Sequence, residues 1–148
     1  MGYCNIADLQ TGGLPQGFFQ GDLAPSPSVQ QSVIDQCAAH IDSLIDSNPD
    51  ITLPFAQPYD PMLVRANIAL AIWELISIRG YNPSNPTDVS LRIRYEDTMT
   101  WVNKVATARA TLVHQKTKEN PKGVQPDVLG NAPRGIRNWS GSVGGSGW

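Results

Sequence analysis

The residues that could do chemistry are few and widely spaced. The two histidines, His40 and His114, fall in or beside expected helices, and neither has the HExxH spacing of a zinc site. Cys37 precedes His40 by three residues, so one helical turn could bring them together, but two ligands do not make a metal site. We therefore interpret Cys37 as a packed thiol and His40 as a partly exposed helical residue, and we expect no metal site.

Two pairs of carboxylates are spaced for acid–base work or cation binding. Asp42 and Asp46 are four residues apart on one helix face, and Glu96 and Asp97 are adjacent. Such pairs more often form a solvated surface. The glycine-rich segment 144–147 is no phosphate loop, because neither a lysine nor a helix follows it. The sequence predicts no catalytic residue and no cofactor, so we expect that the protein is not an enzyme.

Charge divides the chain into two parts. The whole chain has 148 residues and a formal net charge of -2. Residues 1–112 carry six Lys or Arg and eleven Asp or Glu, a net charge of -5, whereas residues 113–148 carry five and two, a net charge of +3. Hydrophobic periodicity also stops near residue 113. We therefore predict an acidic body at 1–112 and a basic, extended arm at 113–148.

Apolar residues recur with helical period through the body. We expect a short helical turn within 5–11, then a helix that begins near Ser28 as N-cap, carries an apolar stripe from Val29 onward, and ends at residues 48–49. A helix apolar on nearly all sides follows at 61–79, with Asp60 as cap, and the third begins at Thr87 or Asp88. The apolar stripe of this third helix consists of Leu91, Tyr95, Thr98 or Met99, Val102, Val105 or Ala106, Arg109 and Leu112.

These helices predict an all-α fold, a small antiparallel bundle of three main helices with a short N-terminal helix. No useful period-2 alternation indicates strands. The central helix should provide the core through Ile68, Leu70, Ile72 and Leu75. Its polar residues make it unsuited to span a bilayer, so no membrane partner is expected.

The arm combines prolines and glycines with spaced apolar and basic residues. Such a segment cannot bury enough surface to fold alone, so we expect it to order on a partner. Ile136, Trp139 and Trp148 are the candidate anchors, and Arg134 and Arg137 are candidate partners for an acidic surface. Two alternatives stay open. Trp148 is also compatible with a frayed end, and the basic residues of the arm also fit a nucleic-acid-binding accessory protein.

Five ordered segments carry a family resemblance. They are Tyr3 with Ile6-Ala7-Asp8-Leu9, the helix through Ala38, Ile41, Asp42 and Ile45 or Leu44, the segment Ile51-Thr52-Leu53-Pro54-Phe55, the apolar helix from Pro61 to Leu75, and Tyr95-Glu96-Asp97 leading to Trp101-Val102-Asn103-Lys104-Val105-Ala106. Over about residues 1–112 this order resembles the head–tail connector (adaptor, head-completion) proteins of tailed phages, Mu-like prophages included. Thr98 and Ala108 or Arg109 depart from the family pattern, which has Ala and Gly near these places.

The resemblance implies a structural role in the virion. It implies a homo-oligomeric, usually dodecameric, ring beneath the portal protein, assembled in the host cytoplasm and placed at the head–tail junction. The ring would extend the DNA channel, dock tail or stopper (neck) proteins, and insert its C-terminal arms into the portal. The acidic body would let DNA slide past without sequence-specific binding, because negative walls do not hold phosphates.

Overall fold

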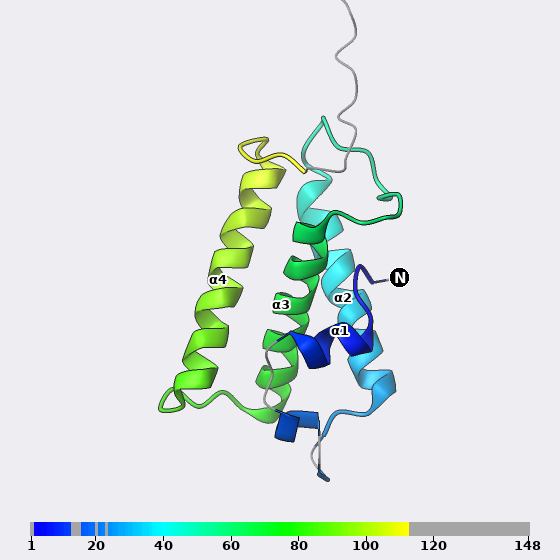
Figure 1. The fold of residues 1–148 in the computed structure, drawn as a ribbon. Helices are drawn as coiled ribbons and strands as arrows, with labels where there is room; N and C mark the ends of the chain where they lie inside the picture. Colours follow the sequence, from blue (N-terminus) through cyan, green and yellow to red (C-terminus); the bar gives the residue numbers. More distant parts are fainter. Residues whose placement is uncertain (1, 13–15, 20, 23, 113–148) are drawn as a thin grey trace, which may run out of the picture. The chain divides into compact units, whose positions relative to one another are not determined.

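Helices account for all the regular secondary structure in the part of the chain that the structure describes. This computed structural model describes residues 2–12, 16–19, 21–22 and 24–112. The elements, in chain order, are α1 (Ile6–Thr11), the 3-10 turn η1 (Gln16–Phe19), α2 (Pro27–Ile45), α3 (Pro61–Arg79) and α4 (Pro86–Ala106). The predicted all-α bundle is confirmed for these residues (Figure 1).

The central helix is α3, which packs against both α2 and α4. Its predicted ends are confirmed. The Asp60 carboxylate accepts a hydrogen bond from the backbone N–H of Met62 at 2.8 Å, and Pro61 occupies the first turn. Gly80 ends the helix with φ of 106°, a backbone conformation that costs a glycine little, and its N–H donates to the Ile76 carbonyl.

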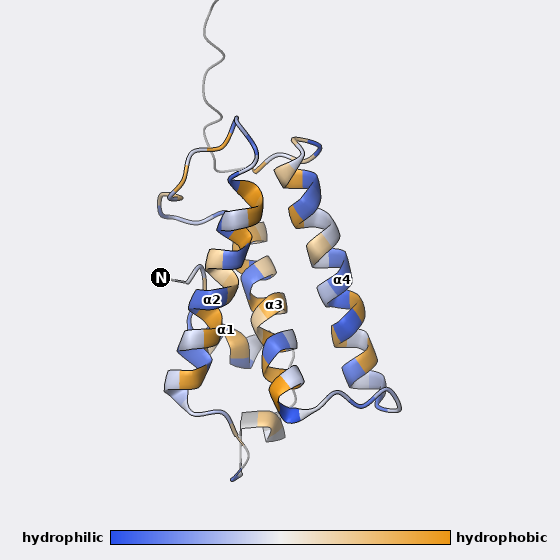
Figure 2. Ribbon diagram, turned by 180° about the vertical axis from the view of Figure 1, so that it is seen from behind, coloured by the Kyte–Doolittle hydropathy of each residue, from blue (hydrophilic) through white to orange (hydrophobic). Residues whose placement is uncertain are grey.

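Of the helices, α3 contributes the largest share of the core of the bundle. Leu70, Ile72 and Leu75 are buried, and Ile68 is partly buried against them. Apolar side chains at the two ends of α3 stay uncovered, since Met62 is 41% exposed and Ile78 is 65% exposed. Figure 2 shows the apolar character of α3 beside the more polar surface of α4.

By length and composition alone, α3 is apolar enough to cross a membrane. Half of its apolar 18-residue stretch is buried inside the bundle. The core helix of a water-soluble bundle has the same properties, and α3 occupies that place between α2 and α4.

The start of α2 lies earlier than predicted. Ser26, not Ser28, is the N-cap, because Pro27 fills the first helical position and needs no hydrogen-bond acceptor for an N–H. Val29 therefore lies in the first turn, is 39% exposed, and does not belong to the buried stripe. The rest of the predicted stripe, Val33, Cys37, Ile41 and Ile45, is buried, with Leu44 partly buried. Ile34 and Ala38 are buried beside it.

Both ends of α4 differ from the prediction. Asn85 is the N-cap and Pro86 follows it, so Thr87 and Asp88 lie inside the helix. At the other end, α4 stops at Ala106, and Arg109 and Leu112 lie beyond the helix. The backbone N–H groups of residues 109 and 110 both donate to the Lys104 carbonyl, and this turn satisfies a terminal acceptor that a longer helix would have used.

The N-terminal residues close one side of the bundle. Asn5 and Asp8 form a reciprocal capping box that starts α1, and Leu9 is completely buried. The Tyr3 hydroxyl donates a hydrogen bond to the Asp42 carboxylate on α2. Phe18 is buried, and the Arg79 guanidinium carbon lies over its ring, 5.1 Å from the ring centroid.

Candidate functional site

The predicted arm contains every residue that we expected to contact a portal. These residues are Arg134, Ile136, Arg137, Trp139 and Trp148, and all lie outside the described residues. The boundary between the body and the arm therefore stays a prediction.

The residues considered for catalysis or metal binding are not brought together. Cys37 is buried and His40 is exposed on α2. On the same helix Asp42 is bonded to the Tyr3 hydroxyl, and Asp46 is exposed. Glu96 and Asp97 lie on α4, where Glu96 faces Arg92 at 3.5 Å. Within the described ranges, no group of three or more His, Cys, Asp or Glu side chains could hold a metal ion.

The two cysteines are poor nucleophiles at neutral pH. Burial raises the pKa of the Cys4 thiol to about 12, with a smaller contribution from Asp8. Burial likewise raises the pKa of the Cys37 thiol to about 12, and Glu74 adds to the effect. Burial also raises the pKa of Tyr3, assisted by its bond to Asp42. Because the thiolate is the reactive form, these thiols are structural at neutral pH.

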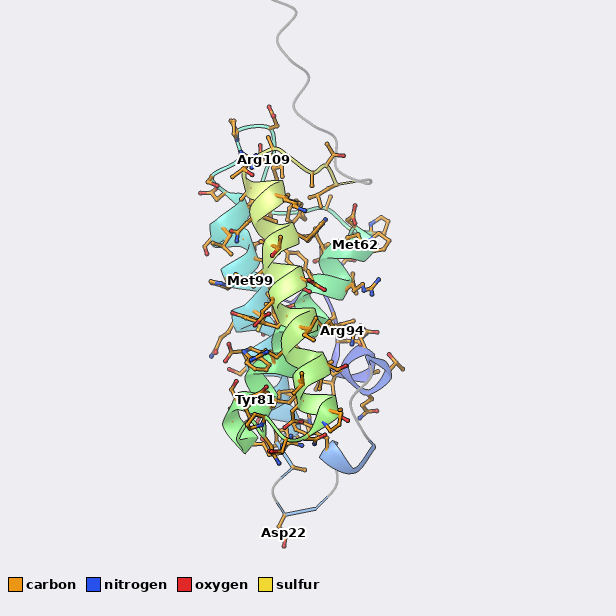
Figure 3. All side chains as sticks on the ribbon, turned by 90° about the vertical axis from the view of Figure 1, so that its left-hand side faces the viewer. Asp22, Met62, Tyr81, Arg94, Met99 and Arg109 are labelled. Carbon is orange, nitrogen blue, oxygen red and sulfur yellow. The ribbon has the colours of Figure 1, made fainter. Side chains whose placement is uncertain are left out.

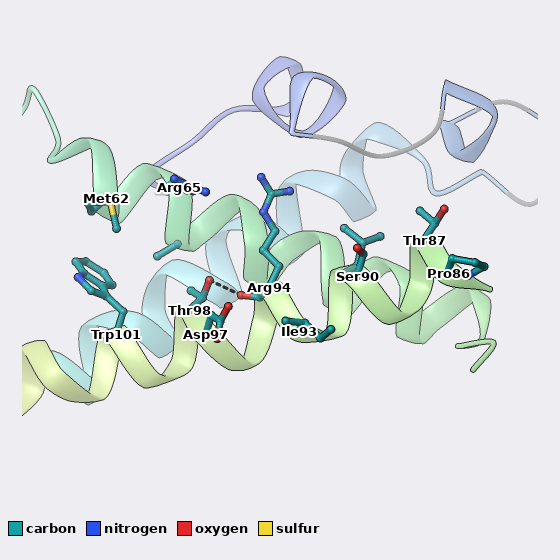
Figure 4. A pocket seen from close by; sticks show the side chains of 12 residues that line it. Met62, Arg65, Pro86, Thr87, Ser90, Ile93, Arg94, Asp97, Thr98 and Trp101 are labelled. Carbon is teal, nitrogen blue, oxygen red and sulfur yellow. Dashed lines mark hydrogen bonds between the residues drawn. The ribbon is translucent and has the colours of Figure 1, made fainter. Parts of the chain in front are cut away.

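The described surface is hollowed between α3 and α4. This α3–α4 groove has a volume of about 850 Å³ and opens to solvent. The first turns of α3 form one wall and the length of α4 forms the other (Figure 4). It is lined by Met62, Arg65, Ala66, Pro86, Thr87, Ser90, Leu91, Ile93, Arg94, Asp97, Thr98 and Trp101.

The groove combines apolar and charged side chains. Met62 is 41% exposed and Ile93 is 49% exposed, so both leave apolar surface at the groove. Arg65, Arg94 and Asp97 supply the charges. Methionine, tryptophan and arginine are enriched where proteins bind one another. The composition of the groove is therefore that of a protein interface.

One wall of the groove is fixed by hydrogen bonds. The Arg94 guanidinium donates to the Gly12 carbonyl, just past the end of α1, at 2.6 Å. The Thr98 hydroxyl donates to the Arg94 carbonyl at 2.7 Å (Figure 4). Figure 3 shows Arg94 and Met62 on the side of α4 that carries α1, away from Tyr81 and Met99. Arg94 thus links the groove to the N-terminal segment.

Aromatic contacts hold α4 on its other side. Trp73 of α3 stacks on Tyr95 of α4 with ring centroids 5.4 Å apart. Tyr81, in the connecting loop, lies 5.5 Å from the same tryptophan. These rings attach the middle of α4 to α3 along one edge, and the opposite edge forms the groove.

A buried carboxylate fixes the turn between α3 and α4. The side chain of Asp88 is 2% exposed and accepts two hydrogen bonds from Arg79, at 2.9 and 3.0 Å. The backbone N–H of Asn82 donates to it at 3.0 Å. The sequence suggested Asp88 as a helix cap. In the structure its carboxylate instead joins the end of α3, through Arg79, to the first turn of α4. The start of α4 is therefore set at a defined position on α3.

Sequence reasoning missed the groove. Met62 was assigned to the buried helix, and Arg65, Ile93 and Arg94 were given no role. Two signals could have found it. Arg65 interrupts the apolar surface of α3, and Ile93 falls outside the α4 stripe that runs through Leu91. A cation on an apolar helix and an aliphatic residue on a polar face both depart from the pattern of their helix, and the structure brings them to the same groove.

Comparison with known protein families gives a match over most of the chain. The family described as Bacteriophage Mu, Gp36 matches residues 3–128. The match includes all the described helices and continues beyond residue 112, where the predicted body ends. Comparisons with curated proteins and with solved structures give no match.

Proposed function

We propose that this chain, which belongs to the bacteriophage Mu Gp36 family, is a head–tail connector (adaptor) protein of a tailed phage. Membership makes it a phage protein and supports a structural or assembly role in the virion. The observation that carries the proposal is the family match over residues 3–128, which covers the whole helical bundle. The connector role is the finer step, and it rests on the ordered segments from Tyr3 to Ala106 described above.

The proposed role is mechanical, and no catalytic step is involved. The bundle would repeat as a ring beneath the portal protein, with tail or stopper proteins on its other side. With a net charge of -5 on residues 1–112, such a ring would have acidic walls. Acidic walls do not attract DNA phosphates, so DNA could slide through the channel.

The arms at 113–148 would attach the ring to the portal. One arm would bind weakly because ordering it costs entropy. A ring presents many arms together, and linked binding events strengthen one another. We assign the anchoring contacts to Ile136, Trp139 and Trp148, and the contacts with an acidic portal surface to Arg134 and Arg137.

Removing part of the arm tests this proposal. Deletion of residues 133–148 should leave a helical, soluble protein that no longer sediments with portal rings of the phage that encodes it. A full-length Trp139→Ala, Arg137→Ala variant should lose most of the binding, whereas Lys104→Ala, a change on α4 of the bundle, should keep it. Normal portal binding by the deletion protein would exclude the arm as the attachment.

The alternative is a nucleic-acid-binding accessory protein, favoured by the net charge of +3 on residues 113–148. This role predicts DNA binding whose affinity falls steeply as salt increases. Titration of the full chain against duplex DNA at two salt concentrations separates the two roles. Salt-sensitive DNA binding without portal binding would replace the connector proposal.

A further inference from the structure

The charges of the bundle are segregated along the chain. Residues 1–64 contain no lysine or arginine and seven Asp or Glu. Residues 65–112 contain six Lys or Arg and four Asp or Glu. The first segment forms α1 and α2, and the second forms most of α3 and all of α4. The bundle therefore has an acidic side at α2 and a side at α3 and α4 that holds its basic residues.

The outer surface of α2 is acidic and nearly flat. Asp35 and Asp42 lie on α2 and Asp46 caps its end, and their spacings of seven and four residues place them along one side. Asp46 is exposed, whereas Asp42 is partly buried and accepts the hydrogen bond from the Tyr3 hydroxyl. A shallow hollow of about 600 Å³ lies beside Asp35. The side chains around it are short or polar, so a neighbouring protein could approach closely. We call this surface the acidic α2 face; it comprises Ser28, Gln31, Ser32, Asp35, Gln36, Ala39, Asp42 and Asp46.

The α3–α4 groove has the opposite character. Its two arginines, Arg65 and Arg94, outnumber its one carboxylate, Asp97. Ile93 projects from it with 49% of its surface exposed. The chain's own residues 113–148 carry a net charge of +3 and are therefore a poor electrostatic match for this groove. The acidic α2 face is a better electrostatic match for the groove, because it is rich in carboxylates and the side chains around them are short.

We propose that the α3–α4 groove of one copy binds the acidic α2 face of a second copy. This inference rests on the proposed ring and names the contact that would build it. The α3–α4 groove and the acidic α2 face are different surfaces of one copy. When two copies bind, the groove of one copy and the acidic α2 face of the other remain available for further copies. Repetition of such a head-to-tail contact closes into a ring when the rotation between copies permits it.

Cross-linking of the full chain tests the contact directly. Ile93→Cys places a thiol at the groove, and Gln36→Cys places one on the acidic α2 face. A bismaleimide should convert the double variant into a ladder of dimers, trimers and larger species. The native thiols contribute little, because Cys4 is 9% exposed and Cys37 is 6% exposed.

The matched control moves one thiol out of the groove. Ile78 is also an exposed isoleucine, 65% exposed, near the far end of α3 and outside the groove. The Ile78→Cys, Gln36→Cys variant should give no ladder. Absence of a ladder from the Ile93 variant overturns the proposal. Dimers without larger species also overturn it, because they indicate a closed two-fold contact.

Charge reversal provides a second test without cysteines. Arg65→Glu should weaken self-association at least about tenfold in sedimentation experiments, and Asp35→Lys in the same chain should restore it. Lys104→Glu makes the same charge change outside the groove and should have little effect. Failure of Arg65→Glu to weaken association, or of the double variant to restore it, counts against the pairing.

The two proposals fail in different ways. If the cross-linked protein gives a ladder but forms no ring on portals, the contact between copies is supported and the connector role is contradicted. A portal-bound ring whose copies give no ladder would keep the connector role and overturn this contact, leaving the groove to another occupant, such as residues 113–148 or a second protein.

Discussion

The two outer helices of the bundle, α2 and α4, are buried to different extents. Of the 19 residues of α2, seven are buried. Of the 21 residues of α4, only Asp88, Leu91, Val102 and Val105 are buried. No residue between Leu91 and Val102 is buried, and this stretch forms the wall of the α3–α4 groove. The apolar side of α2 is thus buried within one copy, whereas the middle of α4 stays uncovered and can contact another molecule.

A charge in the shared core should have the largest effect on this comparison. Leu70 of α3 is 3% exposed and belongs to the core cluster that both helices contact. Leu70→Asp buries an unpaired carboxylate, at a cost on the order of the whole stability of a small domain. We expect loss of cooperative thermal unfolding, measured by circular dichroism. A soluble and fully helical variant would contradict the placement of the core.

Truncating one isoleucine on α2 and one on α4 compares how much each helix contributes to the free energy of unfolding through buried side chains. Ile41 of α2 is 0% exposed, whereas Ile93 of α4 is 49% exposed. Ile41→Ala should lower the free energy of unfolding by about 2–5 kcal/mol, and Ile93→Ala should change it by less than about 0.5 kcal/mol. Urea titration of both variants gives the comparison. Equal losses would mean that the middle of α4 is packed as tightly as α2.

The Asp88 cross-link should contribute less than a core isoleucine. Asp88→Ala removes the acceptor for Arg79 and for the Asn82 N–H. The Arg79 side chain is 37% exposed and can be solvated instead, so we expect a loss of about 1–2 kcal/mol. Urea titration measures it. Asp88→Asn keeps one acceptor and should lose less; an equal loss would assign the effect to packing alone.

A pH titration should give the smallest effect, from the α2 side. Burial raises the pKa of the Cys37 thiol from its ordinary value of 9.0 to about 12. Between these two values the unfolded chain loses the proton and the folded chain keeps it. The contribution of the protonated Cys37 thiol to the free energy of unfolding is therefore fully present below pH 9 and is lost as pH rises toward 12. Cys37→Ala should reduce the slope of unfolding free energy between pH 8 and 10, and an unchanged slope would contradict the assignment.

Local signals predicted some helix ends and could have predicted more. All three main helices begin with a capping residue followed by proline: Ser26-Pro27, Asp60-Pro61 and Asn85-Pro86. The rule was applied correctly at Asp60 and would have corrected the other two starts. The end of α4 was harder to predict, because the apolar spacing continues to Leu112 while the backbone turns after Ala106.

Burial along α2 could be predicted because helical periodicity identifies its inner side, and burial of α3 because that helix is apolar on nearly all sides. The sequence could single out Arg65 and Ile93 but could not place them beside one groove, because the groove depends on how closely α3 and α4 approach. Trp73, Tyr95 and the Asp88 cross-link set that approach, and each joins residues from different elements. The sequence also contained the charge segregation, but which surfaces carry these charges depends on how α2, α3 and α4 pack against one another.

Electron microscopy of the full chain mixed with the portal protein of its phage tests the central claim most directly. The connector account predicts a ring of this protein on the portal face that points away from the capsid, with density from each copy entering the portal. Portal rings without added density, with the protein free in solution or bound to DNA, would contradict it.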